Sequence, residues 1–333
     1  MHGTIVKVEY RSRSLAGEDI TVSGLIAYPN GTPAPPAGRP VLAFAHGTTG
    51  IGDSCAPSDD PATFSVVSPL LNTFLDQGMV LAETDYEGLG EPGRHPYLVG
   101  ESEGRSVLDI VRAAQRIPDA HAGPDVVIWG HSQGGHAALF ANQIAATWAP
   151  ELHILGTVAG APATELPLIV TGLSAAADPF FQVMIAAGFQ AAYPELDLHD
   201  VLTAGALARI GVVDDGCTSD IAKAYADLPG AQTTKANPYD VPTWRTRIDE
   251  NDPGHVRTDD PIFIYQGGND EIIPVVLSEL LFNRLCGLGQ VVQRTVYPDQ
   301  SHDGALVAGL GDITAWIDAR VAGQPAVNSC PSP

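Results

Sequence analysis

Short apolar runs alternate along this chain with segments of helical periodicity, and this alternation constrains the fold more than any other feature. The runs fall at residues 41–45, 79–82, 126–129, 152–159, 262–265 and 291–297, after two strand-like segments at 5–10 and 20–28. Helical segments lie between them at 107–114, 137–148, 275–285 and 305–317. This pattern predicts an α/β protein with a mostly parallel central sheet flanked by helices, and with reactive groups at the carboxyl ends of its strands.

The strongest local signal is the pentapeptide Gly130-His131-Ser132-Gln133-Gly134, which follows an apolar run and opens an alanine-rich helix. It fits the pattern G-x-S-x-G, in which a serine stands on a sharp turn between a strand and a helix. The glycines allow the strand and the helix to approach closely, and the helix N-terminus favours negative charge beside the serine. This context predicts an α/β-hydrolase fold with Ser132 as the nucleophile.

A serine hydroxyl needs a base, and the base needs an acid that holds its tautomer. His302 follows the last predicted strand and precedes a helix, which is the position of the base in this fold. Asp270 follows the strand at 262–265, and the chain order serine, acid, histidine is then correct. We therefore expect Asp270 to be the acid, with its neighbour Glu271 as the main rival.

The tetrahedral intermediate of acyl transfer needs two backbone N–H donors for its oxyanion. One is expected to be the amide of Gln133, the residue after the nucleophile. The other is expected in the glycine-containing loop after the strand at 41–45, where we favour the amide of Thr48 over that of Thr49. An ordinary glycine turn is the alternative interpretation of this loop.

One stretch breaks the alternation, from about Pro162 to Thr258. We expect an inserted, mainly helical cap at residues 162–258 on a core formed by residues 1–161 and 259–333. A helical connection without a role in binding is the alternative. The apolar side chains of Phe180, Phe181 and Met184 are candidates for an acyl pocket, or equally for anchoring the cap.

Tyr86 follows a predicted strand end and is a weak candidate to border the site, or else a structural tyrosine.

Composition excludes several other functions. The 333 residues fit one large α/β domain with an insertion, and the net charge of −22 argues against nucleic-acid binding. The chain contains no run of about 18 apolar residues, so we expect no membrane-spanning helix, and we expect no signal peptide within this chain. No phosphate-binding loop, dinucleotide fingerprint or metal-ligand spacing is present, so we expect neither a cofactor nor a metal. The oligomeric state is not predicted.

The four cysteines allow three pairings and sit in no C-x-x-C motif. Two disulfides in an oxidising compartment, or four reduced thiols, both remain open from spacing alone.

Several motifs resemble the secretory lipase family of lipase A-like α/β-hydrolases, in particular its actinobacterial members. They are Ala45-His46-Gly47-Thr48-Thr49-Gly50, Cys55-Ala56-Pro57-Ser58, Thr84-Asp85-Tyr86-Glu87-Gly88-Leu89-Gly90, His95-Pro96-Tyr97 and Gly130-His131-Ser132-Gln133-Gly134-Gly135. The resemblance implies a capped α/β-hydrolase core, hydrolysis of esters that include lipids in some members, and secretion. It also implies the disulfides Cys55–Cys217 and Cys286–Cys330.

The expected function is therefore hydrolysis of carboxylic esters through an acyl-enzyme, with a small-molecule or lipid ester as substrate. Relative to the fungal lipase of the family, the cap is expected to be shorter or differently built, which favours short to medium acyl groups. An acyltransferase, or an amidase or peptidase with the same triad, is the alternative. A non-catalytic binding protein on a hydrolase scaffold is a further one, against which the complete set of serine, acid and histidine argues.

Overall fold

A single mixed sheet forms the centre of the molecule. The computed structural model describes residues 3–31, 33–59, 72–174 and 179–331. Its strands are β1 (Gly3–Arg13), β2 (Asp19–Pro29), β3 (Arg39–Ala45), β4 (Val80–Thr84), β5 (Ala122–His131), β6 (His153–Gly160), β7 (Ile262–Gly267) and β8 (Val292–Tyr297).

The strand order is β1-β2-β4-β3-β5-β6-β7-β8. The pairs β1–β2 and β2–β4 are antiparallel, and the other pairs, from β4 and β3 across to β8, are parallel. The mostly parallel sheet expected from the sequence is thus present. At the β1 end of the sheet, β2 runs opposite to both of its neighbours, β1 and β4. Since the six parallel strands end on the same side, the loops after β3, β5, β7 and β8 gather at one edge of the sheet.

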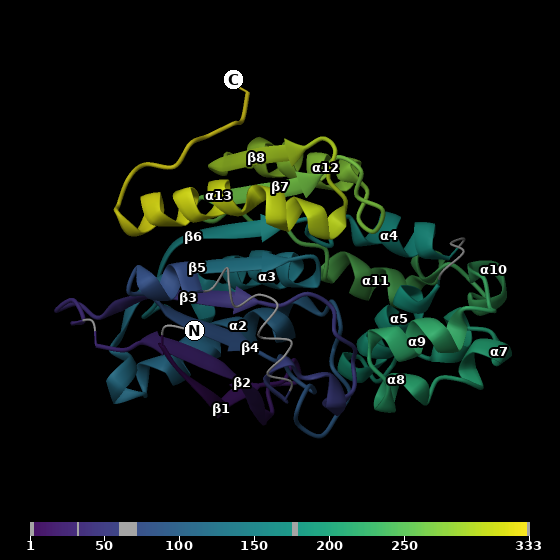
Figure 1. Cartoon of the computed structure of the whole chain (residues 1–333). Coiled ribbons are helices and arrows are strands. Elements are labelled where there is room, and N and C mark those ends of the chain that lie inside the picture. The colour runs from purple at the N-terminus through teal and green to yellow at the C-terminus, as the bar shows by residue number, and fades with distance from the viewer. Residues whose placement is uncertain (1–2, 32, 60–71, 175–178, 332–333) are drawn as a thin grey trace.

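Helices cover both faces of the sheet (Figure 1). Along β3, Val41, Ala43 and Ala45 pack toward one face, and Leu42 and Phe44 toward the other. The first face is covered by α2 (Gly100–Gln115), α3 (Gln133–Trp148) and α12 (Val275–Gly287), and the second by α13 (His302–Val321). Strands buried on both faces explain why their sequences read as continuous apolar runs rather than as alternating ones.

The residues between β6 and β7 form a layer of helices beyond the carboxyl ends of the parallel strands (Figure 1). These helices are α4 (Leu166–Leu173), α5 (Phe180–Ala192), α6 (Leu198–Val201), α7 (Ala204–Leu207), α8 (Val212–Asp215), α9 (Thr218–Tyr225), α10 (Gly230–Thr233) and α11 (Pro242–Glu250). Four short 3-10 helices lie at Asp53–Cys55, Pro57–Asp59, Pro118–Ala120 and Pro238–Asp240 in the described chain.

Local signals explain where several of these helices begin. Proline stands at the first position of α11, where its missing N–H leaves no hydrogen bond unmade. The side chains of Asp197 and Thr203 accept hydrogen bonds from backbone N–H groups at the starts of α6 and α7. The helical layer has its own apolar centre around Val183, Phe189 and Trp244, all essentially inaccessible to solvent.

One disulfide joins the helical layer to the core. It links Cys55, the last residue of the 3-10 helix Asp53–Cys55 after β3, to Cys217, at the start of α9. An isolated bridge between Gly50 and Cys217 and a hydrogen bond from the amide of Thr218 to the carbonyl of Thr49 (2.9 Å) reinforce this connection. The layer is therefore tied to the loop that carries the expected oxyanion donor Thr48.

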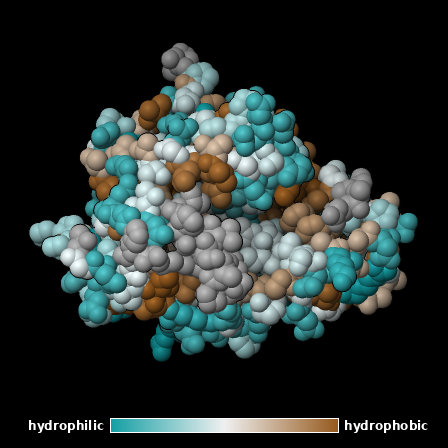
Figure 2. Space-filling view, viewed as in Figure 1, coloured by the Kyte–Doolittle hydropathy of each residue, from teal (hydrophilic) through white to brown (hydrophobic). Residues whose placement is uncertain are grey.

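A second disulfide, Cys286–Cys330, attaches the C-terminal segment to α12. Both pairs are those that the family resemblance implies. No helix in the described part of the chain is long and apolar enough to cross a membrane. On the face seen in Figure 2, apolar side chains gather in small separate clusters among hydrophilic ones.

Candidate active site

Ser132 occupies a strained turn between β5 and α3. Its backbone has φ 61° and ψ −121°, a conformation that a residue with a side chain rarely adopts. Close packing explains the two glycines around it. A Cβ on Gly130 would lie 2.0 Å from the carbonyl oxygen of Gly134, and one on Gly134 would lie 1.9 Å from that of Ala45. The serine is thereby presented at the N-terminus of α3.

His302 and Asp270 form a buried pair. The Nδ1 atom of His302, the first residue of α13, lies 2.8 and 3.0 Å from the two carboxylate oxygens of Asp270. The side chains are only 4% and 0% exposed, which shields the pair from water. The carboxylate thus leaves the Nε2 atom of His302 free for another partner, as a general base requires.

The loop after β7 also orients the carboxylate of Asp270. One of its oxygens accepts hydrogen bonds from the amides of Ile272 (3.0 Å) and Ile273 (2.8 Å), and the other accepts one from Gln266 Nε2. Glu271 has a different position. It is exposed, and its carboxylate accepts a hydrogen bond from the backbone amide of His302 (3.1 Å) rather than from the imidazole.

Ser132 and His302 line one cavity of about 620 Å³, which we call the histidine cavity. Its other lining residues include Gly47, Thr48, His131, Leu173, Phe180, Phe181 and Glu271. Across the described residues the Ser132 hydroxyl makes no hydrogen bond, so the serine and the histidine face a common space without a bond between them. Such bonds are often long or absent in unliganded active sites and tighten when substrate binds.

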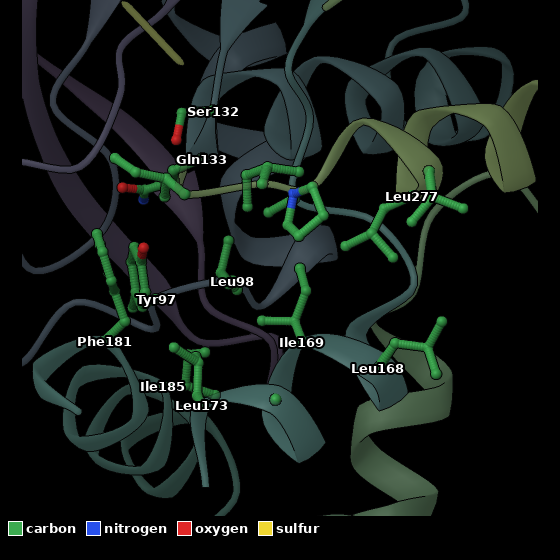
Figure 3. A pocket seen from close by; sticks show the side chains of 16 residues that line it. Tyr97, Leu98, Ser132, Gln133, Leu168, Ile169, Leu173, Phe181, Ile185 and Leu277 are labelled. Carbon is green, nitrogen blue, oxygen red and sulfur yellow. The ribbon is translucent and has the colours of Figure 1, made fainter. Parts of the chain in front are cut away.

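A second cavity, of about 260 Å³, opens beside Ser132 and is almost entirely apolar; we call it the apolar cavity. The helical layer contributes Leu168, Ile169, Leu173, Phe181 and Ile185, and the rest of the chain contributes Leu98, Ile272, Ile273, Val276 and Leu277. Figure 3 shows Ser132 and Gln133 on one side of this space, with the leucine and isoleucine side chains of α4 across from them. The cavity therefore lies between the helical layer and the core.

The two expected oxyanion donors lie near this serine. Gln133 is the first residue of α3, where backbone N–H groups have no partner within the helix. Thr48 lines the histidine cavity, and its Oγ1 atom lies 2.8 Å from the hydroxyl of Tyr97. The rival Thr49 lines neither of the two cavities next to Ser132, and its carbonyl is bonded to Thr218. The position of Thr48 fits an oxyanion donor better.

The four candidate substrate contacts differ in their positions. Phe180 and Phe181 lie with their ring centroids 4.1 Å apart and their ring planes tilted by 31°, and both line the histidine cavity. Met184, on the same helix, is fully buried in the apolar centre of the helical layer and lines neither cavity. Tyr86 also lies outside both cavities. It is buried with φ 72°, and its hydroxyl donates a hydrogen bond to the carbonyl of His46 (2.9 Å).

The positions of Met184 and Tyr86 favour the alternative roles considered for them, an anchor within the helical layer and a structural tyrosine, over contact with substrate. Met184 packs into the apolar centre of the helical layer, and Tyr86 donates a hydrogen bond to the loop between β3 and Thr48. Sequence position alone did not distinguish these faces.

His131 lies beside His302, with ring centroids 4.7 Å apart. Its Nδ1 is 3.1 Å from the hydroxyl of Tyr265, and its Nε2 is buried without a hydrogen-bond partner. Burial, together with the charge that His302 can carry, lowers the pKa of His131 to about 3. His131 is therefore neutral around pH 7 and does not compete with His302 for the negative charge of Asp270.

Nitrogen atoms of His131 and His302 and a carboxylate oxygen of Asp303 lie within 4.8 Å of one another. Within the described residues, this is the group whose atoms could converge on a metal ion. A cation bound there would block the His302 nitrogen that faces the cavity, so the arrangement suits a base better than a set of metal ligands.

Two features near Ser132 had not been expected. Tyr97 contacts Thr48, and Glu103 of α2 is fully buried against His136 and Gln133. Glu103 lies four and seven residues before Val107 and Ile110, on the apolar face of its helix. A charged residue on the apolar face of a predicted helix is the sequence signal that could have pointed to this buried carboxylate.

Comparison with known sequences places the chain in a family. The family model described as Secretory lipase matches residues 62–329. The chain belongs to the secretory lipase family. Lipase 6 of Candida albicans is 26% identical over 307 residues, covering 83% of this chain and 65% of that protein. A secreted triacylglycerol lipase of Malassezia globosa is 25% identical, covering 87% and 67%. This secretory lipase family member thus spans just under two thirds of the length of the Candida albicans relative.

Two crystal structures share the fold of this chain. Candida antarctica lipase A in its closed state matches with a TM-score of 0.84 and 21% identity, covering 99% of this chain and 80% of that one. The rice cell wall degrading esterase LipA of Xanthomonas oryzae matches with a TM-score of 0.80 and 18% identity, covering 96% and 91%. These similarities establish the α/β-hydrolase fold that the G-x-S-x-G pentapeptide around Ser132 predicts.

Proposed function

We propose that this secretory lipase family member hydrolyses carboxylic esters through an acyl-enzyme formed on Ser132. The observation that carries the proposal is the strained Ser132 at the start of α3, in a cavity shared with a histidine that a buried carboxylate orients. The names of the relatives, among them a secreted triacylglycerol lipase, support ester chemistry. Family membership and two disulfides support a secreted protein.

In the proposed reaction, the Oγ atom of Ser132 attacks the ester carbonyl while Nε2 of His302 takes its proton. Asp270 holds the Nδ1–H of His302 and stabilises the imidazolium that forms. The carbonyl oxygen becomes an oxyanion, which the amides of Gln133 and Thr48 bind. The tetrahedral intermediate then collapses, and His302 returns the proton to the departing alcohol.

Water completes the cycle by the same route. His302 removes a proton from a water molecule, whose oxygen attacks the acyl carbonyl on Ser132. The second tetrahedral intermediate releases the carboxylic acid, and His302 returns its proton to Ser132. No step needs a cofactor.

We further propose that the apolar cavity binds the acyl group. Its wall of leucine and isoleucine side chains begins at Ser132, and its volume of about 260 Å³ is small for a ligand pocket, which ordinarily has about 300–1,000 Å³. A cavity of this size favours short to medium acyl chains. Phe180 and Phe181 border the histidine cavity, where the leaving alcohol would lie.

In this proposal residues 162–258 form a cap on a core of residues 1–161 and 259–333. The eight helices described between β6 and β7, outside residues 175–178, and the position of both cavities at their contact with the core, support that division.

The test is a set of initial rates on p-nitrophenyl esters with acyl chains of two to sixteen carbons, with Ser132→Ala alongside. We expect rates that peak at short or medium chains and are lost in the variant, while its thermal unfolding resembles that of the wild type. A peak at long chains would indicate a larger acyl site than the cavity provides. Full activity in Ser132→Ala would disprove the nucleophile, and inactivity on every ester would favour an acyltransferase or an amidase.

A further inference from the structure

A second buried carboxylate lies directly behind the nucleophile turn. Glu103, on α2, is fully inaccessible to solvent and lines neither of the cavities beside Ser132. Its Oε1 atom accepts hydrogen bonds from Gln133 Nε2 (2.8 Å) and from the amide of Leu98 (3.0 Å). Its Oε2 atom lies 2.7 Å from Nδ1 of His136. The proposed reaction does not use this group.

Burying an ionised carboxylate costs several kcal/mol unless its partners compensate, so a site such as this one depends on its complete set of partners. Burial by itself would raise the pKa of Glu103, but His136 and His95 outweigh it and lower the pKa to about 2. The Nε2 atom of His95 lies 3.6 Å from the carboxylate. Glu103 is therefore an anion around pH 7.

The first connection from Glu103 leads to the oxyanion donor on α3. The side chain of Gln133 is anchored on Glu103 and also lies 2.7 Å from His95 Nε2, while the backbone amide of the same residue is the proposed donor. His136, one turn further along α3, is held by Glu103 on one side and by the carbonyl of Asn251 (2.9 Å) on the other. Glu103 thus holds two residues of the first turn of α3.

The second connection leads to the other donor. Glu103 fixes the amide of Leu98, and the adjacent Tyr97 places its hydroxyl 2.8 Å from the side chain of Thr48. Tyr97 therefore links the segment held by Glu103 to the loop after β3. Both proposed donors are within two contacts of the same carboxylate, although they come from loops more than 80 residues apart in the sequence.

We propose that Glu103 is a positioning residue that aligns the two oxyanion donors, Gln133 and Thr48, without contacting substrate. The proposal rests on the function proposed above and deepens it. Its physical basis is that an oxyanion site stabilises the transition state only when its donors are held in place before the reaction. A loose donor would still allow the ester to bind, because the apolar cavity makes those contacts.

The decisive variant is Glu103→Gln, which keeps the size of the side chain but replaces an acceptor by an amide N–H donor. Both oxygens of Glu103 accept from N–H groups, Oε1 from Gln133 Nε2 and the Leu98 amide and Oε2 from His136. The new amide group must therefore point its own N–H at one of these donors, which removes a hydrogen bond. The matched control is Glu101→Gln on the same helix. Glu101 is half exposed and pairs with Arg105, away from the nucleophile turn.

The measurements are kcat and KM on p-nitrophenyl butyrate, inhibition by an alkyl boronic acid, inhibition by butyrate, and thermal unfolding. Boronic acids form a tetrahedral adduct with the serine that occupies the oxyanion site, whereas butyrate reports ground-state binding. For Glu103→Gln we expect kcat to fall about tenfold to a hundredfold at an unchanged KM. Boronate affinity should fall by a similar factor, butyrate affinity should stay, and Glu101→Gln should match the wild type.

A folded Glu103→Gln protein with wild-type kcat and boronate affinity would overturn the proposal and leave the esterase function intact. So would a variant in which KM rises while kcat stays. If Glu103→Gln does not fold, Gln133→Met decides, because it removes the anchor of the side chain but retains the backbone amide. A fall in kcat and in boronate affinity would support the proposal, and wild-type values would overturn it. A wild-type protein that neither cleaves esters nor binds boronate would overturn both proposals together.

Discussion

The core wall of the candidate active site combines hydrogen-bonded polar groups with apolar side chains such as Ile272 and Leu277, whereas the cap wall, formed by the proposed cap, is mostly apolar and held by packing. On the core side, Asp270 accepts three hydrogen bonds besides that of His302, and Glu103 accepts three at the back of α3. On the cap side, Leu168, Ile169 and Leu173 present only aliphatic groups to the cavity.

This difference separates two tasks. Hydrogen bonds have a defined direction, so the core wall can hold reacting atoms in one geometry. Apolar contacts depend mainly on buried area and shape, so the cap wall can select substrates by size without fixing any atom. Changes to the core wall should therefore affect the rate of the chemical step, and changes to the cap wall should affect the choice of acyl chain.

The largest expected effect is on the acid. Asp270→Asn should reduce kcat by about 10³- to 10⁴-fold, because an amide cannot hold His302 in the tautomer that accepts a proton from serine. The matched control is Glu271→Gln, since the Glu271 carboxylate accepts a hydrogen bond from the backbone amide of His302 rather than from its imidazole. Its rate should stay within a few-fold of the wild type. Equal losses in kcat/KM for the two variants would show that Glu271 shares the role of the acid.

The next effect concerns the disulfide between the two regions. Replacing both Cys55 and Cys217 by alanine should lower the free energy of unfolding by about 2–4 kcal/mol, because the bond closes a long loop in the unfolded chain. It should also lower kcat, since Cys217 is bridged to Gly50 in the loop of Thr48. Denaturant unfolding and ester rates measure the two effects.

The control is the corresponding double substitution of Cys286 and Cys330, which join α12 to the C-terminal segment. The shorter loop predicts a loss of stability smaller by about 1 kcal/mol, and esterase kcat should not change. If this control lowered kcat as much, the disulfide at Cys55 would have no special role at the active site.

A smaller effect, on the stability of the folded protein, tests whether a buried carboxylate of the core needs hydrogen bonds to remain ionised without loss of stability. Glu83, in β4, is fully buried, and its Oε2 atom has no hydrogen-bond partner among the described residues. Burial, with a contribution from Asp85, raises the pKa of Glu83 to about 8. Between about pH 4.5 and 8 the folded protein keeps a proton that the unfolded chain releases, so stability is full below that window and falls as pH rises through it.

Glu83→Gln should remove this dependence and stabilise the protein at pH 8, with little change at pH 4.5. Chemical unfolding at the two pH values measures it. Asp85→Asn is the contrasting variant, because Asp85 accepts hydrogen bonds from Ser23 and Ser58 and its replacement should destabilise the protein. Equal stability of Glu83→Gln and wild type at pH 8 would contradict the expectation.

The smallest effect is on the cap wall. Leu173→Ala enlarges both cavities at their shared wall and should shift the preferred acyl chain to a longer one. The ratio of kcat/KM between long and short esters should change by about tenfold, in keeping with roughly 1–3 kcal/mol per methylene in an apolar pocket. Val307→Ala, at an exposed site on α13, is the control. A uniform loss for all chain lengths would mean that the cap wall also takes part in the chemical step.

Much of the core was predictable because its signals are local. The apolar runs predicted the buried strands, and the glycines around Ser132 predicted a turn in which a Cβ would clash. The start of α2 was not predicted. Its first two turns contain Ser102, Glu103 and Arg105, which are buried through their hydrogen bonds and not through apolar periodicity.

The candidate substrate contacts show the same limit. Phe181 and Met184 lie three residues apart on α5, yet only Phe181 reaches a cavity. Tyr86 was correctly placed after a strand, but its ring turns into the core. The apolar character of these residues was evident, whereas the direction each one faces depends on how α5 and the loops pack.

By itself, the sequence determined the succession of strands and helices along the chain and the turn at Ser132, and it predicted the proposed succession of serine, acid and histidine. Each of these depends on backbone sterics and on periodicity within a few residues. Only the tertiary structure decided which cap side chains face the serine, and that Glu103 lies behind both oxyanion loops. Those arrangements arise from contacts between segments far apart in the chain, and the free energy of such contacts depends on the packing of the whole molecule.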